Sequence, residues 1–204
     1  AGHGGAAARA QGRAARGGLV TRFWWLRHAP TGAAGMIGWT DPPAVLDRAA
    51  LARVAACLPA RAVVVSSDLS RAVATADAVQ GARDRLPHDP RLREIHFGAW
   101  EGRDAAAVDG PAARAFWDGS GPAPGGEGWR DLCARVGAAT DELARAGHAE
   151  VVVVAHHGPI LAALQRARGC TPREALAVRL THLGLTEMAV GPSGWTVGRV
   201  DRAA

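Results

Sequence analysis

The sequence predicts an α/β protein, a three-layer α/β/α sandwich around a largely parallel central sheet. Short continuous apolar runs, such as 62–65 and 150–155, are typical of strands that are buried on both faces of a parallel sheet. Segments with apolar residues at helical spacing alternate with these runs, which is the pattern of βαβ units. The 204 residues are enough for one such domain with a sizeable core.

The expected strands and helices alternate along the chain. Val20 to Arg27 is rich in aromatic and branched residues and ends just before Pro30 and Gly32, which favours a strand leaving a sheet. Trp129 to Ala146 is the clearest helix, because its apolar residues recur at helical spacing. The other expected strands are 62–65, a short extended segment at 86–90, 150–155, and a closing hairpin of 185–190 and 195–200. The other expected helices are 47–58, 71–79, a helical turn at 112–118, and a helix that follows residue 159.

The N-terminal residues differ in composition from the rest of the chain. Residues 1–18 are almost wholly Gly, Ala and Arg. Such a segment has little apolar surface to bury, so we expect it to be a disordered extension. It lacks the apolar region of a secretory signal peptide. Residues 19–204 contain no internal repeat and no second domain, so we expect a single domain there.

Charge and cysteine content narrow the possible partners and compartments. The formal net charge is +5, and all 24 cations are arginine. Because these arginines are scattered among acidic residues, we predict no nucleic-acid partner. No apolar run approaches the length of a bilayer span, so no membrane partner is expected. Cys57, Cys133 and Cys170 lie far apart and form no CxxC motif, which suits reduced cysteines in a cytoplasmic protein.

Polar residues follow three of the predicted strands. Arg27 and His28 end the first strand, Ser66 to Asp68 end the second, and His156 ends the last long one. Ser66 to Asp68 are also expected to cap the helix that contains Arg71. Because parallel strands end at one edge of a sheet, where ligands bind, we expect these side chains to face one crevice.

This set of side chains suits a phosphoryl group. Arginine presents a planar fork to phosphate oxygens, and a helix N-terminus adds backbone donors. A neutral imidazole can attack phosphorus as a nucleophile. We expect no metal or cofactor, because His156 and His157 are adjacent and no HxH, HExxH or Walker motif occurs. The expected partner is a small-molecule phosphate ester, and the oligomeric state, monomer or homodimer, stays open.

Five blocks of the chain match, in the same order, the motifs of a known family. They are RHA (27–29), SSDLSRAVATA (66–76), LREIHFGAWEG (92–102), PGGE (124–127) and VVAHHGPI (153–160). On these blocks the chain resembles the histidine phosphatase superfamily, also called phosphoglycerate mutase-like, over residues 20–200. Ala29 replaces the glycine of the family's Arg-His-Gly motif, so the turn after His28 must accept a Cβ. The loop GMIGWTDPP (35–43) is similar to that of α-ribazole phosphatases.

The resemblance implies a role for each catalytic candidate. His28 would be the nucleophile that accepts the phosphoryl group. Arg27, Arg71 and His156 would bind the phosphoryl oxygens. Glu94 would protonate the leaving oxygen and then activate water.

Three further residues are weaker candidates. Glu101 competes with Glu94 for the role of the acid, and we favour Glu94. Thr31 and His157 are added as substrate-binding residues. A packing or rim position is the simpler interpretation of His157.

The expected function is a metal-independent phosphomonoesterase that works through a phosphohistidine intermediate in one histidine phosphatase domain, 19–204. Phosphoglycerate mutase-type transfer is the alternative within the family. The compact segment between Trp100 and Glu127 favours the phosphatase over the mutase. A non-catalytic, phosphate-sensing or protein-binding domain of the same fold is the alternative from another class, and it predicts loss of a catalytic residue.

Overall fold

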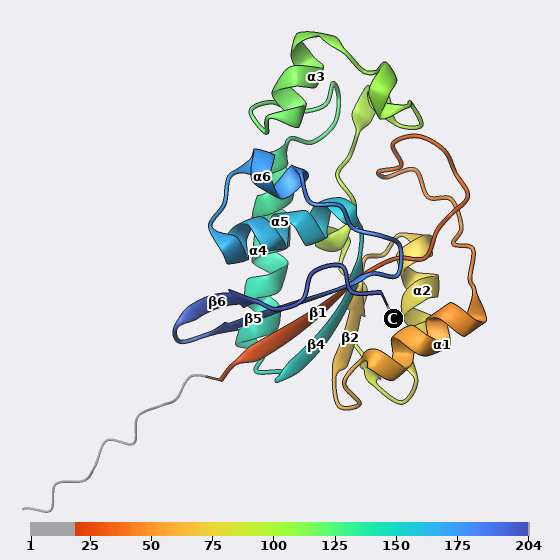
Figure 1. Ribbon diagram of the computed structural model, residues 1–204, viewed down its shortest axis with the longest axis vertical. Coiled ribbons are helices and arrows are strands. Elements are labelled where there is room, and N and C mark those ends of the chain that lie inside the picture. Colours follow the sequence, from red (N-terminus) through yellow and green to blue (C-terminus); the bar gives the residue numbers. More distant parts are fainter. Residues whose placement is uncertain (1–18, 204) are drawn as a thin grey trace, which may run out of the picture.

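The computed structural model describes residues 19–203 and contains a six-stranded sheet with helices on both faces (Figure 1). The strand order is β3-β2-β4-β1-β5-β6. The first four strands in this order are parallel, and β5 and β6 are antiparallel to their neighbours. The predicted α/β fold with a largely parallel sheet is therefore confirmed. The strands are β1 (Thr21–Arg27), β2 (Val63–Ser66), β3 (Asp84–Arg85), β4 (Glu150–Ala155), β5 (Leu185–Gly191) and β6 (Gly194–Val197).

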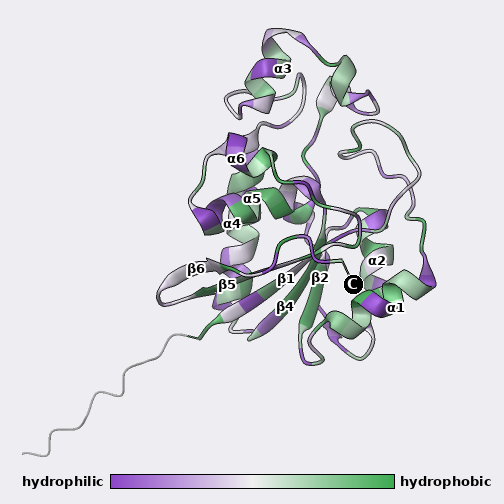
Figure 2. Ribbon diagram, in the orientation of Figure 1, coloured by the Kyte–Doolittle hydropathy of each residue, from purple (hydrophilic) through white to green (hydrophobic). Residues whose placement is uncertain are grey.

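The centre of the sheet is the pair β1 and β4, which contain the apolar runs 23–26 and 151–155. They pair in register from Arg22 opposite Glu150 to Arg27 opposite Ala155. Successive residues of β4 point to opposite faces, so Val151 and its alternates enter one core cluster while Val152 and its alternates enter the other. The strands β2 and β4 are accordingly coloured hydrophobic over most of their length in Figure 2.

Two helices cover each face of the sheet. The face with Val152 packs against α1 (Arg48–Cys57) and α2 (Ser70–Gln80), and the other face against α4 (Trp129–Arg145) and α5 (His157–Arg168). The start of α1 follows from Asp47, whose side chain accepts hydrogen bonds from two N–H groups of the first turn. The predicted helices 47–58, 71–79 and 129–146 are present with boundaries shifted by at most one residue.

The segment between β3 and α4 lies beyond the carboxyl ends of the parallel strands, at the top of Figure 1. Its core is aromatic, with Phe116 against Trp100 (ring centroids 5.4 Å apart) and against Phe97 (5.9 Å). This segment, which we call the roof segment, covers the edge of the sheet where β1 and β4 end. It contains three short 3-10 helices, η1 (Pro90–Leu92), η2 (Gly98–Trp100) and η3 (Ala105–Ala107), and the helix α3 (Gly110–Trp117).

The structure corrects the predicted start of α2. Ser66 to Asp68 were expected to cap this helix, but its N-cap is Leu69, which makes no side-chain cap hydrogen bond. Asp68 instead accepts two hydrogen bonds from Arg93, at 2.6 and 2.7 Å. A distant arginine therefore outcompetes the local backbone for this carboxylate.

The sequence analysis missed some elements and misplaced another. The helix α6 (Pro172–Leu176) and the 3-10 helices are too short to give a periodic signal. The extended segment expected at 86–90 is not a strand, and the strand of this region is the shorter and earlier β3. The disorder expected for residues 1–18 concerns a segment outside the described residues. All three cysteines are free, and no helix within residues 19–203 has the length and apolar character needed to cross a membrane.

Candidate active site

The predicted site residues meet at the carboxyl ends of β1 and β4. His28 follows β1, and its backbone N–H donates to the carbonyl of Ala155 at the end of β4 (3.0 Å). His156 follows directly, so the parallel pairing brings both histidines to one edge. Their ring centroids lie 5.0 Å apart. The convergence of the strand ends is thus as the sequence predicted.

One of the two ring nitrogens of His28 is engaged in a hydrogen bond. Its Nδ1 lies 2.6 Å from the carbonyl oxygen of Ala29, which can only accept, so Nδ1 carries the proton. The lone pair is then on Nε2. Burial lowers the pKa of His28 to about 3, and the charges of Arg71, Arg27 and His182 act in the same direction. His28 is therefore neutral near pH 7 and holds a free lone pair.

A threonine of α2 fixes the turn after His28. The Ala29 N–H donates to Thr75 Oγ1 (2.9 Å), and the Thr75 hydroxyl donates to the carbonyl of Arg71 one helical turn earlier (2.7 Å). The turn accepts the Cβ of Ala29, which is fully buried at negative φ. The nucleophile candidate and Arg71 are thereby tied to the same helix.

Two arginines flank His28, and each uses part of its guanidinium to hold backbone. Arg27 donates from one terminal nitrogen to the Leu180 carbonyl (2.5 Å). Arg71 is fully buried and donates to the carbonyls of Gly38 (2.6 Å) and Thr40 (2.9 Å). Burial lowers the pKa of both arginines, and the charge of Glu94 opposes this shift in each. Glu94 therefore lies within electrostatic reach of both.

Several buried polar atoms in this cluster have no hydrogen-bond partner. Arg27 Nε, Arg71 Nε and both ring nitrogens of His156 are buried and lack a hydrogen bond within residues 19–203. An unpaired buried polar atom is costly, about 1–3 kcal/mol each, so such atoms rarely gather without a ligand to satisfy them. Burial and the charges of nearby His28 and Arg71 hold the pKa of His156 well below its usual range, so its ring is neutral.

Glu94 reaches the same site from the segment that forms the roof. Its carboxylate accepts hydrogen bonds from the backbone N–H of Gly158, at the start of α5 (3.0 and 3.1 Å), and of Ile95 (2.8 Å). Only glycine fits at position 158, because a Cβ there would collide with Glu94 Oε1. The helix N-terminus therefore orients a buried carboxylate beside the two guanidinium groups.

Glu101, the competing acid, is engaged elsewhere. Its carboxylate accepts backbone N–H bonds from Gly38, Trp39, Thr40 and Phe97, at 2.9–3.3 Å. Burial alone would raise the pKa of Glu101, but these donors outweigh it and lower the pKa. This carboxylate fastens the loop after His28 to the roof segment, which supports Glu94 as the acid.

The two weaker substrate-binding candidates differ in position. His157 is the first residue of α5 and is half-buried, and burial lowers its pKa while Glu94 opposes the shift. It lies beside the cluster. Thr31 is in the loop after His28, where its hydroxyl accepts from the Ala33 N–H (3.3 Å). That bond directs the Thr31 hydroxyl to its own loop.

The structure adds residues that the sequence did not single out. His182, in the turn before β5, stacks at a tilt on His28 with ring centroids 5.3 Å apart. The surrounding protein lowers the pKa of His182 to about 4, with Arg27 and His157 contributing. Arg135 of α4 donates to the carbonyls of Arg91, Arg93 and Glu94 and pairs with Glu127, which holds the backbone at Glu94. The turn that contains His182 has no periodic pattern from which the sequence could have identified this residue. Glu127, in contrast, lies in the PGGE block, which was visible in the sequence.

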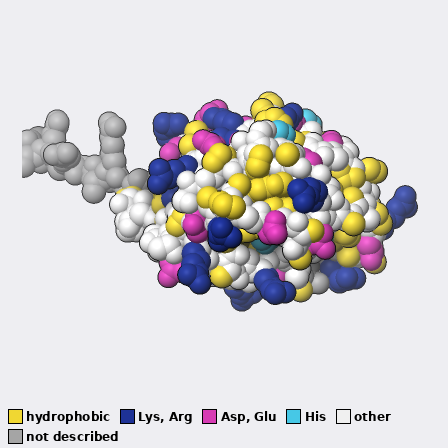
Figure 3. Space-filling model, turned by 90° about the horizontal axis from the view of Figure 1, so that it is seen from above, with side chains coloured by type: hydrophobic (Ala, Val, Ile, Leu, Met, Phe, Trp, Pro, Cys, Tyr) yellow, Lys and Arg dark blue, Asp and Glu magenta, His cyan; other side chains and the backbone are white. Residues whose placement is uncertain are grey.

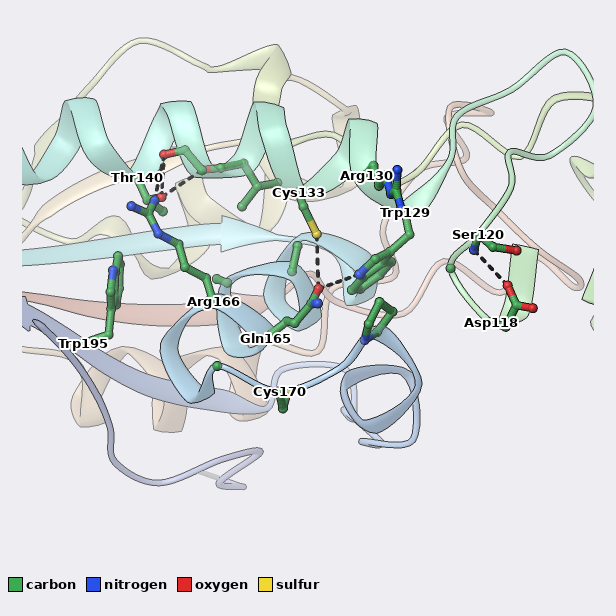
Figure 4. A pocket seen from close by; sticks show the side chains of 17 residues that line it. Asp118, Ser120, Trp129, Arg130, Cys133, Thr140, Gln165, Arg166, Cys170 and Trp195 are labelled. Atoms are coloured by element: carbon green, nitrogen blue, oxygen red, sulfur yellow. Dashed lines mark hydrogen bonds between the residues drawn. The ribbon is translucent and has the colours of Figure 1, made fainter. Parts of the chain in front are cut away.

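A larger cavity lies outside this cluster. It has a volume of about 680 Å³ and opens between α4, α5 and the start of α6 (Figure 4). Gln165 at its centre accepts from Trp129 Nε1 (2.5 Å) and Cys133 Sγ (3.4 Å), and Arg166 pairs with Asp141 (2.8 Å). Burial raises the pKa of Cys133 to about 11, so its thiol is a poor nucleophile. The polar groups named here satisfy one another.

Comparison with known proteins agrees with this geometry. Residues 23–202 match the family model of the histidine phosphatase superfamily (branch 1). A glucosyl-3-phosphoglycerate phosphatase of Mycolicibacterium vanbaalenii is 41% identical over 118 residues, which make up 52% of this chain and 52% of that protein. The chain thus spans about half the length of the curated relatives of that name.

Solved structures extend the likeness over most of the chain. A putative α-ribazole-5′-P phosphatase of Escherichia coli superposes with a TM-score of 0.78 at 23% identity, covering 90% of this chain and 97% of that one. At this identity it supports the fold alone. A mycobacterial glucosyl-3-phosphoglycerate phosphatase in complex with VO3 gives a TM-score of 0.74 at 30% identity, covering 89% and 98%. With its strand-end histidines, its buried arginine and the match over residues 23–202, the chain belongs to the histidine phosphatase superfamily.

Proposed function

We propose that the chain is a phosphoric monoester hydrolase that carries the phosphoryl group on His28. The observation that supports this most directly is the state of His28. Its Nδ1 is committed to the Ala29 carbonyl, its ring is neutral, and its Nε2 lone pair lies beside unpaired donors of Arg27, Arg71 and His156. A neutral nucleophile among cationic donors is the arrangement that phosphoryl transfer requires.

In the first half-reaction, His28 Nε2 attacks phosphorus. The N–P bond forms as the P–O bond to the alcohol breaks. Arg27 and Arg71 stabilise the charge on the three equatorial oxygens, and their fixed hydrogen bonds to Leu180, Gly38 and Thr40 keep them in place while the charge develops. Protonated Glu94 gives its proton to the departing alkoxide, a contribution of about 10²–10⁴ in rate.

In the second half-reaction, the Glu94 carboxylate removes a proton from water. The water oxygen forms a bond to phosphorus, the N–P bond breaks, and inorganic phosphate leaves. His28 returns to its neutral form and Glu94 to its acid form. The Gly158 and Ile95 N–H groups hold the carboxylate in one orientation through both steps.

The names of the relatives support a phosphatase. Two of the proteins compared above are called glucosyl-3-phosphoglycerate phosphatases, and one of them was solved with VO3. A probable phosphoglycerate mutase of Proteus mirabilis is 29% identical over 139 residues, which keeps mutase-type transfer as the alternative.

The deciding experiment measures phosphate release from p-nitrophenyl phosphate in the presence of EDTA. We compare the parent protein with His28→Ala and with His88→Ala, an exposed histidine near the edge strand β3. We expect activity in the parent and in His88→Ala that EDTA does not reduce. In His28→Ala we expect a loss of at least about a thousandfold, as removal of an enzyme nucleophile typically gives.

Each other result has a definite meaning. Equal activity in the parent and His28→Ala contradicts a histidine nucleophile. Activity that EDTA abolishes contradicts the metal-independent mechanism. Phosphate binding without release from any ester favours the non-catalytic alternative. Phosphoryl transfer from a bisphosphorylated donor to a second substrate, faster than to water, favours the mutase.

A further inference from the structure

A small cavity of about 120 Å³ opens beside Glu94. Glu94, His157 and Gly158 form its polar end, so it adjoins the phosphoryl site. The rest of its lining is apolar and comes from four helices and from the roof segment outside them. These residues, which we call the aromatic pocket, are Ile95 and Phe97 of the roof segment, Phe116 and Trp117 of α3, Trp129 of α4, Leu161 of α5 and Leu176 of α6.

The walls of the aromatic pocket are packed in place. Phe116 is 5% exposed and contacts Trp117 edge-on, with ring centroids 4.9 Å apart. Leu161 is fully buried at the opposite wall. Trp117 is 39% exposed and forms part of the mouth. Figure 3, which looks down on the roof segment, shows hydrophobic side chains gathered in the middle of that face. The pocket is therefore a preformed apolar surface with one open side.

No cation lines the aromatic pocket. Two arginines near Glu94 are already paired, Arg93 with Asp68 at 2.6 Å and Arg135 with Glu127 at 2.8 Å. A carboxylate on the substrate would find no arginine in the lining of the pocket to pair with, and burying an unpaired charge is strongly unfavourable. An uncharged apolar group meets no such obstacle.

The aromatic pocket lies where the alcohol part of the ester is expected. Under the proposed function, Glu94 protonates the oxygen that leaves with the alcohol. The substituent on that oxygen then lies next to Glu94 on the side away from the phosphoryl-binding arginines, where the aromatic pocket begins. Its volume is of the size that holds one six-membered ring, since an apolar cavity of about 150 Å³ binds benzene.

We propose that the aromatic pocket binds the leaving group, and that the substrates of this chain are phosphate monoesters of uncharged, ring-bearing alcohols rather than of hydroxy acids. This inference rests on the proposed function for its turnover measurement. It differs from what the names of the relatives suggest, since phosphoglycerate carries a carboxylate. Filling an apolar pocket is worth about 10- to 200-fold in specificity per methylene-sized group, so a ring gives a measurable preference.

Two matched pairs of esters test the proposal. Benzyl phosphate and ethyl phosphate both release a primary alcohol but differ in the ring. Phenyl phosphate and 3-carboxyphenyl phosphate share the ring but differ in the carboxylate. We expect kcat/KM to be at least tenfold higher for benzyl than for ethyl phosphate, and at least tenfold lower for 3-carboxyphenyl than for phenyl phosphate.

A variant links the preference to the pocket. Trp117→Ala opens its mouth and is expected to reduce the benzyl-to-ethyl ratio by about tenfold, the low end of the effect of a lost apolar contact. Trp195→Ala, which alters a tryptophan of the larger cavity in Figure 4, is the control and keeps the ratio. A ratio of two rates does not depend on the amount of folded protein, so reduced stability in either variant does not affect the comparison.

A binding measurement separates this proposal from the proposed function. Benzylphosphonate and ethylphosphonate are not hydrolysed, and we expect the first to bind at least tenfold more tightly by calorimetry. Tight benzylphosphonate binding without turnover of any ester overturns the phosphatase and keeps the pocket. Turnover with a benzyl-to-ethyl ratio near one, or faster release from 3-carboxyphenyl phosphate, overturns the pocket and keeps the phosphatase.

Discussion

The cluster around His28 and the cavity between α4 and α5 are opposites in how their polar atoms are satisfied. The cavity has a volume of about 680 Å³, but its Gln165 and Arg166 are bonded to neighbouring side chains. The cluster is crowded, yet Arg27 Nε, Arg71 Nε and the His156 ring nitrogens are buried without partners in the described part of the chain. Unpaired buried donors therefore mark a binding function here more clearly than open space does.

The cause of the difference is the origin of the polar groups. In the cavity they come from neighbouring helices that pack on each other, so partners are available at short range. In the cluster the unpaired atoms belong to two guanidinium groups and a neutral imidazole, at strand ends and at the start of α2. The guanidinium groups carry like charge and cannot satisfy each other, whereas an anion can accept from both of them and from the imidazole N–H.

The largest effect outside the nucleophile is expected from Glu94→Gln. Loss of the proton donor lowers kcat by about 10²–10⁴. The loss is greater for alkyl esters than for p-nitrophenyl phosphate, whose leaving group needs little protonation. Rates of phosphate release from both ester types check this. An equal loss for both types contradicts the role of Glu94 as a general acid.

Arg71→Met is expected to lower kcat/KM by about 10²–10³, the usual cost of removing one charge-stabilising donor. Arg71→Lys keeps the charge but loses the planar fork, so it recovers only part of the activity. Steady-state kinetics check this prediction: kcat/KM should fall in the order parent, Arg71→Lys, Arg71→Met. Full activity in Arg71→Met contradicts a role in binding the phosphoryl oxygens.

The neutral state of His28 also predicts how stability changes with pH. Its pKa is about 3 in the folded protein and near 6.5 in the unfolded chain. Below pH 6.5 the unfolded chain binds the extra proton, so stability falls as the pH drops from 6.5 towards 3. His28→Asn removes one such group and reduces the slope of unfolding free energy against pH by about 1.4 kcal/mol per unit. Urea unfolding at several pH values between 4 and 6 measures it, and an unchanged slope contradicts the buried neutral histidine.

The smallest effect is expected from an Arg→Met substitution in the cavity between α4 and α5. Arg166→Met removes a partly exposed ion pair with Asp141, which is worth about 0–1 kcal/mol. It also removes a contact of the guanidinium with the ring of Trp195 (5.3 Å). We expect kcat/KM to stay within about twofold, because the cavity binds no reacting group under this interpretation. A loss of activity comparable to that of Arg71→Met would show that the cavity takes part in the reaction.

The sequence predicted those site residues that directly follow buried strands. Arg27, His28 and His156 occupy such positions, and parallel strands must end at the same edge. Their convergence could therefore be inferred without coordinates. Arg71 was expected there too, because it lies at the start of the helix that follows the second strand, whereas the position of Glu94 depended on a resemblance to family motifs.

The rest depended on long-range contacts that leave no local pattern. His182 lies in an irregular turn, and Arg135 looks like a surface arginine on the polar face of α4. The choice between Glu94 and Glu101 rests on which backbone N–H groups each carboxylate meets, and those groups belong to distant segments. The aromatic pocket needs the relative placement of α3, α5 and α6, of which the short helix α6 gave no sequence signal.

The hydrogen bond between His28 Nδ1 and the carbonyl of Ala29 has a chemical consequence for the proposed phosphohistidine intermediate. With Nδ1 blocked, only one of the two regioisomers of phosphohistidine can form, the Nε2 (tele) adduct. Phosphoramidates of this kind hydrolyse in acid and survive in alkali. Capture of the adduct therefore calls for an alkaline quench, and isomer-specific detection should return the tele form alone.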